Sequence, residues 1–123
     1  MANILVTDDS LFLRRILCKI LADAGHQMTG AANGVECLQH IEQDTPDIVF
    51  LDLVMPEMDG FGVLQALKEQ HATVPVIVLT ADIQETVRVE CLALGAVAFI
   101  NKPLKEDQVL EILNAALDAL GVA

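Results

Sequence analysis

The sequence predicts a doubly wound α/β domain in which five parallel strands alternate along the chain with five helices. Short aliphatic runs alternate with longer segments whose apolar residues recur every three or four positions. Residues of the AVILMFWYC set make up 54% of the chain but aromatic residues only 3%, so the core must be built from aliphatic side chains. Continuous aliphatic strands are typical of a parallel sheet that helices cover on both faces.

The first strand and helix carry the clearest pattern. The run Asn3–Thr7 is expected to form a central strand. Ser10 can cap the following helix, and Gly25 stands where a left-handed residue would end it, so the first unit spans about residues 3 to 24. The apolar residues that this helix turns inward are expected to be Leu13, Ile16, Leu17, Ile20, Leu21 and Ala24.

The second unit carries a weaker pattern than the first. Gln27–Ala32 is expected to be a short, edge-like strand, followed by a helix that Asn33 can cap and that ends before Pro46. Ile48–Leu51 is again a continuous aliphatic run, typical of a central strand. Asp52 stands at its carboxyl end, so two strands are expected to deliver acids to the same edge of the sheet.

The third helix and fourth strand are also bounded by turn and cap residues. Gly60 is expected to open the helix after the loop Leu53–Asp59, and Pro75–Leu79 to form a strand that ends on Thr80. Asp82, followed three residues later by a glutamate, approximates a capping box for the next helix. That helix is expected to run through Ile83, Val87, Cys91 and Leu94 and to stop at Gly95.

The last strand and helix complete the alternation. Val97–Ile100 is expected to be the fifth strand, ending near Lys102 and Pro103. No usual capping residue follows the proline, because Leu104 and Lys105 stand there, so the first turn of the helix is expected to fray or to start at an unexpected residue. Its inward-facing residues are expected to be Val109, Leu113, Ala116, Leu117 and Leu120.

Charge and composition exclude several classes of protein. Seven Lys and Arg against 18 Asp and Glu give a net charge of −11, which argues against nucleic-acid binding. The longest apolar stretches, such as Cys91–Ile100, are shorter than the roughly 20 residues of a membrane span, and the first residues do not resemble a signal peptide. We therefore expect a cytoplasmic protein made of a single domain over residues 1–123, without an output domain. Its three cysteines, Cys18, Cys37 and Cys91, are expected to be small core residues.

Five chemically active side chains follow the carboxyl ends of the expected strands: Asp8, Asp9, Asp52, Thr80 and Lys102. In a doubly wound sheet, ligands bind at this edge, where the strand order reverses. Three carboxylates gathered there would repel one another, and a hard cation such as Mg²⁺ resolves the conflict. Each feature alone is weak, since an isolated Asp pair is more often a solvated loop or helix cap. Their joint occurrence indicates phosphoryl transfer, with Asp52 as nucleophile and with the metal, Lys102 and the Thr80 hydroxyl each taking one phosphoryl oxygen.

These residues lie within four longer motifs: Ile4–Ser10, Asp52–Gly60, Leu79–Ala81 and Phe99–Pro103. With them the whole chain resembles the receiver domains of response regulators, and in its length the CheY-like receivers that consist of one domain. The resemblance implies a flavodoxin-like fold with strand order 2-1-3-4-5. It also implies a two-component signalling protein that is not an enzyme for a separate substrate. Such a receiver catalyses its own phosphorylation from a sensor histidine kinase or phosphotransfer protein, and then acts on a downstream protein target, as in chemotaxis.

The resemblance also implies a ligand set for the metal. Asp9 and Asp52 would bind Mg²⁺ directly, and Asp8 would help through water. The backbone carbonyl of Val54 would complete the protein ligands, while its side chain would contribute nothing to the metal.

A second group of residues is implied to contact and report the phosphoryl group. Thr80, Ala81 and Lys102 would contact it, and the bond from Lys102 to Pro103 is similar to one that is cis in the family. Thr80 and Phe99 match the switch pair, in which the hydroxyl moves toward the phosphoryl group and the ring swings inward. This change would alter the surface of the fourth helix, fifth strand and fifth helix.

Three positions depart from the pattern or tune it. Phe99 stands where chemotaxis members often carry Tyr, so ring burial would act without a phenol hydrogen bond. Val54 and Asp82 occupy the variable positions two residues beyond Asp52 and Thr80, where relatives guide or exclude the hydrolytic water. Val54 cannot orient water, and slow self-dephosphorylation is therefore expected.

Three other functions are weighed against this interpretation. A haloacid dehalogenase phosphatase would need a second Asp at position 54, where this chain has Val. A flavodoxin-like electron carrier would need aromatic side chains and a phosphate loop that Asp8 and Asp9 would repel, and the chain has no Trp or Tyr. A phosphorylation-independent interaction module stays open, because a fold can persist after its chemistry decays.

Overall fold

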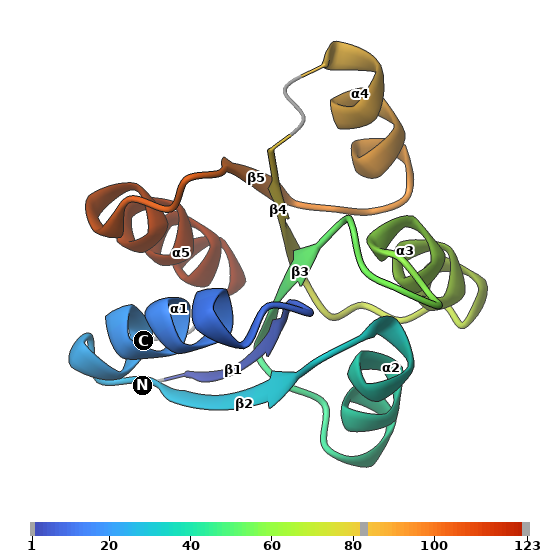
Figure 1. The fold of residues 1–123 in the computed structure, drawn as a ribbon. Helices are drawn as coiled ribbons and strands as arrows, with labels where there is room; N and C mark the ends of the chain where they lie inside the picture. The colour runs from blue at the N-terminus through green and yellow to red at the C-terminus, as the bar shows by residue number, and fades with distance from the viewer. Residues whose placement is uncertain (1, 82–83, 122–123) are drawn as a thin grey trace.

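The structure is a computed structural model that describes residues 2–81 and 84–121. It contains five parallel strands in the order β2-β1-β3-β4-β5, which confirms the predicted fold class and strand order (Figure 1). Strands and helices alternate as β1 (Asn3–Thr7), α1 (Leu11–Asp23), β2 (Gln27–Ala31), α2 (Gly34–Gln43), β3 (Ile48–Asp52), α3 (Gly60–Glu69), β4 (Val76–Thr80), α4 (Glu85–Ala93), β5 (Ala98–Asn101) and α5 (Glu106–Leu120).

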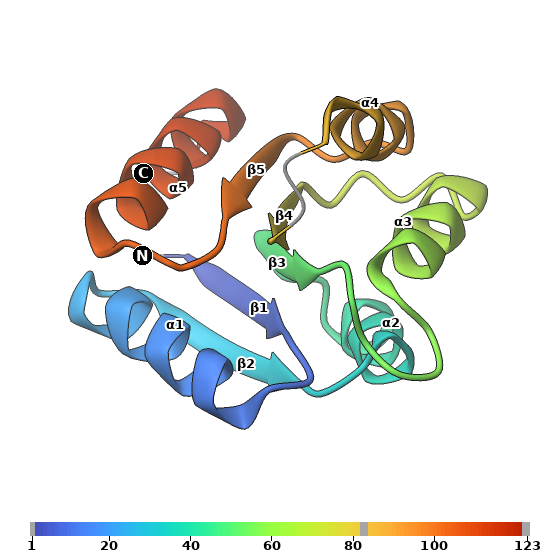
Figure 2. The same ribbon diagram turned by 45° about the horizontal axis from the view of Figure 1, so that its top comes forward.

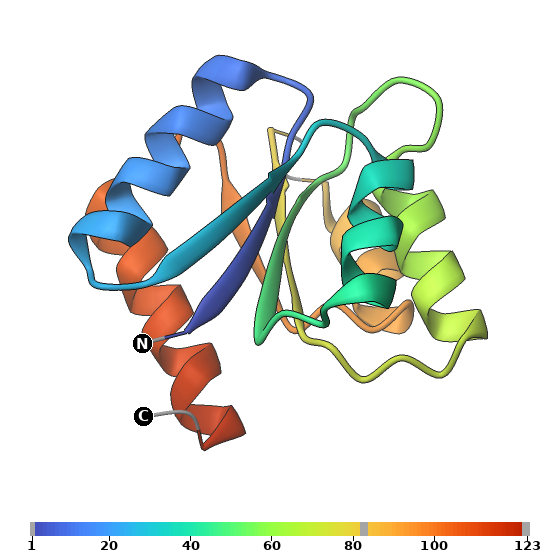
Figure 3. The same cartoon turned by 90° about the horizontal axis from the view of Figure 1, so that it is seen from below.

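Helices cover both faces of the sheet. Figures 1 and 3 show α1 and α5 on one face and α2, α3 and α4 on the other. Side chains alternate between the two faces along each strand, so in β3 Ile48 and Phe50 join the cluster under α1 and α5, whereas Val49 and Leu51 join the opposite one. Every residue of β3 and of β4 is buried, which explains why these strands are continuously aliphatic in sequence.

The predicted helix caps are observed at two of the helices. Ser10 Oγ accepts the amide hydrogen three residues on at 3.2 Å, and Asn33 Oδ1 does the same at 2.9 Å. Asp59 caps α3 in the same way at 2.9 Å. The helix α5 begins after Lys105 without a side-chain cap, as expected from the residues that follow Pro103. These local bonds fix where the helices begin at the edge that carries the site.

Some predicted boundaries differ from the observed ones. The expected cap Asp82 and the expected helical residue Ile83 lie outside the described residues, and the fourth helix begins at Glu85, after Gln84. The strand β4 begins at Val76 because Pro75 has no amide hydrogen to donate to a ladder. The strand β5 is shifted by one residue, to Ala98–Asn101, because its pairing with β4 begins at Ala98.

The cysteine prediction is correct for two of the three residues. Cys37 and Cys91 are buried, whereas Cys18 is only partly covered. Burial raises the pKa of the Cys37 and Cys91 thiols to about 11, so both remain protonated at neutral pH and act as small core residues. Within residues 2–81 and 84–121 there is no helix with the length and hydropathy needed to cross a bilayer.

Candidate metal centre

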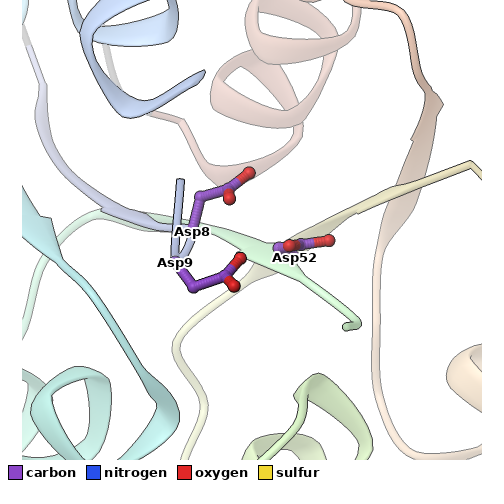
Figure 4. Close-up of side chains that lie close together, drawn as sticks. All are labelled: Asp8, Asp9 and Asp52. Carbon is purple, nitrogen blue, oxygen red and sulfur yellow. The ribbon is translucent and has the colours of Figure 1, made fainter. Parts of the chain in front are cut away.

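Three carboxylates meet at the carboxyl edge of the sheet. Asp8 and Asp9 directly follow β1, and Asp52 is the last residue of β3, so all three lie at the edge of the sheet where the strand arrows of Figure 2 end. Figure 4 shows the three side chains close together. One oxygen of each lies within 4.8 Å of the other two. Asp8 and Asp52 are only 2% and 5% exposed, whereas Asp9 is open to solvent. The structure therefore brings together the three acids that the sequence predicts, with one of them accessible from outside.

Lys102 provides the positive charge of the cluster. Its Nζ lies 3.1 Å from Asp52 Oδ1 and 3.2 Å from Asp8 Oδ2, and its side chain is 19% exposed. The Lys102 amide donates to the Thr80 carbonyl at 2.8 Å, which extends the pairing of β4 and β5 to this residue. The bond from Lys102 to Pro103 is cis, as the resemblance implied. A counter-charge for Asp8 and Asp52 is therefore already present in the chain, which the sequence argument had assigned to the metal alone.

Asp8 is held at four points, two on its backbone and two on its side chain. Its amide donates to the Ala31 carbonyl at 3.1 Å, and its own carbonyl accepts from the Arg14 guanidinium at 2.6 Å. Its Oδ1 accepts from the Ser10 amide at 2.9 Å, while Oδ2 contacts Lys102. Sequence reasoning missed Arg14, because nothing in the pattern distinguishes it from its neighbour Arg15.

Burial and charge shift the ionisation of the central pair. Burial raises the pKa of the Asp52 carboxyl above its ordinary value, the nearby Asp8 raises it further, and Lys102 offsets part of the effect. Burial by itself would lower the pKa of Lys102, but its contacts with Asp52 and Asp8 outweigh that effect and leave it raised. Three carboxylates against one ammonium leave an excess of negative charge on hard oxygen donors, which suits a divalent cation such as Mg²⁺.

The loop between β3 and α3 folds closely over Asp52. The Val54 amide lies 3.4 Å from Asp52 Oδ1, and Val54 is 79% exposed. The Gly60 amide donates to the Leu53 carbonyl at 2.9 Å. A Cβ at Gly60 would lie only 2.6 Å from the Asp52 carbonyl oxygen, so a residue without a side chain is needed there for the loop to close.

The expected switch residues lie on the same face of the sheet. Phe99 pairs with Val78 across β4 and β5 and is half-buried against the cluster under α2, α3 and α4. Thr80 is two residues beyond Val78, so its side chain points to that same face, and it is 3% exposed. Ala81 is exposed directly after it, and the expected modulating residue Asp82 lies outside the described residues.

Comparison with known proteins shows the family. The family model of the response regulator receiver domain matches residues 4–114, so the chain belongs to this family of signalling proteins. It is 34% identical to the chemotaxis protein CheY of Bacillus subtilis over 94% of this chain and 98% of the relative. It is 37% identical to protein PilH of Pseudomonas aeruginosa, over 95% and 98% of the two chains. The solved structure of Vibrio cholerae CheY4 superposes with a TM-score of 0.89 at 31% identity, covering 95% of this chain and 99% of that one.

Proposed function

We propose that the chain accepts a phosphoryl group on Asp52 with the help of Mg²⁺, and that its phosphorylation passes a two-component signal to another protein. The main support is the position of the Asp52 carboxylate, which is buried between Asp8 and Lys102 at the edge where Asp9 is open to solvent. The membership of the chain in the receiver family supports the same function.

The oxygen donors available to the cation fit the proposal. Asp9 and Asp52 would bind Mg²⁺ directly, Asp8 through water, and the Val54 carbonyl would complete the protein ligands. When bound, the cation neutralises negative charge on the transferred phosphoryl oxygens. It would also relieve the repulsion among the three carboxylates, which lie within 4.8 Å of one another.

The chain's own residues carry the rest of the transfer. A carboxylate oxygen of Asp52 forms a new bond to phosphorus while the bond from phosphorus to the donor's histidine nitrogen breaks. The electron pair of the broken bond stays on that nitrogen. A donor ring that is protonated on its other nitrogen leaves as neutral histidine, and an unprotonated ring takes up a proton from solvent to become neutral. Lys102, already 3.1 Å from Asp52, pairs its ammonium group with one phosphoryl oxygen, and the Thr80 hydroxyl and the Ala81 amide donate to the others.

The lifetime of the phosphorylated state is proposed to be long. Val54 is 79% exposed beside the acceptor and has no polar group with which to orient an attacking water. Asp82 is the second position proposed to tune hydrolysis. Loss of the phosphoryl group by self-catalysis would therefore be slow, and the chain would be a signalling receiver more than a turnover enzyme.

The proposed output is a change of the surface formed by α4, β5 and α5. Thr80 and Phe99 would move together as the phosphoryl group stabilises one of two arrangements. The donor would be a sensor histidine kinase or phosphotransfer protein in the cytoplasm, and the target a protein rather than nucleic acid. Relatives named as chemotaxis proteins support a role in chemotaxis.

Intact mass after treatment with acetyl phosphate tests this function. The parent should gain the mass of one phosphoryl group in Mg²⁺ and none in EDTA, and Asp52→Asn should gain none in either. A parent that gains no mass with magnesium and a competent donor would instead favour the phosphorylation-independent interaction module.

A further inference from the structure

We infer that Arg14 is a positioning residue for the magnesium site, acting through the peptide group between Asp8 and Asp9. This inference depends on the function proposed above. The guanidinium of Arg14 donates to the Asp8 carbonyl oxygen at 2.6 Å, across six positions from the helix α1 back to the loop before it. That carbonyl belongs to the same rigid peptide plane as the Asp9 amide, so Arg14 fixes the orientation from which the Asp9 side chain starts.

Asp9 needs such support more than Asp8 does. The Asp8 carboxylate is buried and held directly by the Ser10 amide and by Lys102. The Asp9 carboxylate is exposed, so its direction depends on the backbone that carries it. Groups that orient a ligand residue raise metal affinity because less freedom is lost when the ion binds.

The neighbouring strand leaves room for the arginine. A Cβ built on Gly30 of β2 would meet the Arg14 side chain at Cδ and Nε, both at 3.8 Å. The stem of Arg14 therefore lies along β2 at Gly30 on its way to the Asp8 carbonyl. An alanine there would make ordinary van der Waals contact, whereas the two methyl groups of a valine would press on the arginine.

Positioning and simple electrostatics predict opposite effects when Arg14 is removed. A positive charge near the cluster repels a cation, so its loss should by itself strengthen magnesium binding. If Arg14 mainly orients the Asp8–Asp9 peptide, its loss should instead weaken binding, by about tenfold as for other residues that orient metal ligands. The sign of the change in affinity separates the two roles.

The test compares Arg14→Met with Arg15→Met by calorimetric titration of the unphosphorylated proteins with MgCl₂. Both variants lose one positive charge, but Arg15 is an exposed neighbour on the same helix. Arg14→Met should bind magnesium about tenfold more weakly than the parent, whereas Arg15→Met should bind equally or slightly more tightly. Equal affinities for the two variants, or tighter binding by Arg14→Met, would overturn the inference.

A second pair of variants leaves every charge in place. Gly30→Val should displace Arg14 and weaken magnesium binding in the same direction, while Gly30→Ala should stay within about twofold of the parent. With phosphoramidate as donor, Arg14→Met should need about tenfold more Mg²⁺ for half-maximal phosphorylation yet reach a plateau rate within about twofold of the parent. A fall in the plateau without a change in magnesium dependence would also contradict positioning. A parent that binds no magnesium would refute the proposed function itself, which is a distinct result.

Discussion

Replacing Asp52 by asparagine should stabilise the metal-free protein while abolishing its phosphorylation. The substitution keeps the shape of the side chain but removes a charge that is 5% exposed. At an effective dielectric constant of about 20, a second carboxylate within 4.8 Å repels it by at least about 3.5 kcal/mol. Lys102 at 3.1 Å attracts it by about 5 kcal/mol on the same scale. These two terms are opposite in sign and similar in size, so the cost of burying the carboxylate decides the sign of the net effect.

The raised pKa of Asp52 agrees with that sign. The folded protein binds the proton of this carboxyl more tightly than the unfolded chain does, so the stability of the metal-free parent should rise as pH falls through the raised pKa toward the ordinary value. At neutral pH, Asp52→Asn should gain about 1 to 2 kcal/mol, consistent with relief of a buried charge. The stability of Asp52→Asn should not show the rise at lower pH that the Asp52 carboxyl gives the parent.

Urea unfolding in EDTA at low salt measures the effect. Glu111→Gln is the matched control, because it removes one negative charge from an exposed position in the middle of α5. It should change stability by less than about 0.5 kcal/mol. Mg²⁺ at 100 times its dissociation constant should then stabilise the parent by about 2.7 kcal/mol, and Asp52→Asn by much less. An Asp52→Asn protein that unfolds at the same or a lower urea concentration than the control would refute the reasoning.

Three further predictions concern other parts of the site. Lys102→Met should lower the stability of the metal-free protein by about 2 kcal/mol in urea unfolding, because Asp8 and Asp52 lose their shared counter-charge, and a stability equal to the parent's would contradict this. Gly60→Ala should lower the free energy of unfolding by about 1 to 3 kcal/mol, because its Cβ would lie 2.6 Å from a backbone oxygen. Gly30→Ala, whose nearest contact would be at 3.8 Å, should lower it by less than about 1 kcal/mol. Similar losses of stability for both would show that the loop can shift freely. Val54→Asn should shorten the phosphoryl lifetime several-fold when acyl phosphate is followed by intact mass, and an unchanged or longer lifetime would count against the role given to Val54.

The sequence alone determined the order of elements and the identity of the acids. Continuous aliphatic runs predict β1, β3 and β4 because such strands are covered on both faces, and polar side chains at their ends predict the site edge. The caps at Ser10 and Asn33 were predictable because a cap involves only neighbouring residues. The predicted start of α4 depends on Asp82 and Ile83, which lie outside the described residues; in the part of the chain that the structure describes, the helix begins at Glu85.

Only the tertiary structure decided how the charges are shared. Lys102 is 94 positions from Asp8 in sequence, and its two contacts exist because β1, β3 and β5 end at the same edge of the sheet. The choice of Arg14 over Arg15 likewise depends on the side of α1 that faces β2 and on the space left at Gly30. Residue patterns report which side chains occur at the end of a strand, but distances between them, and hence ionisation, follow from the packing of segments that are remote along the chain.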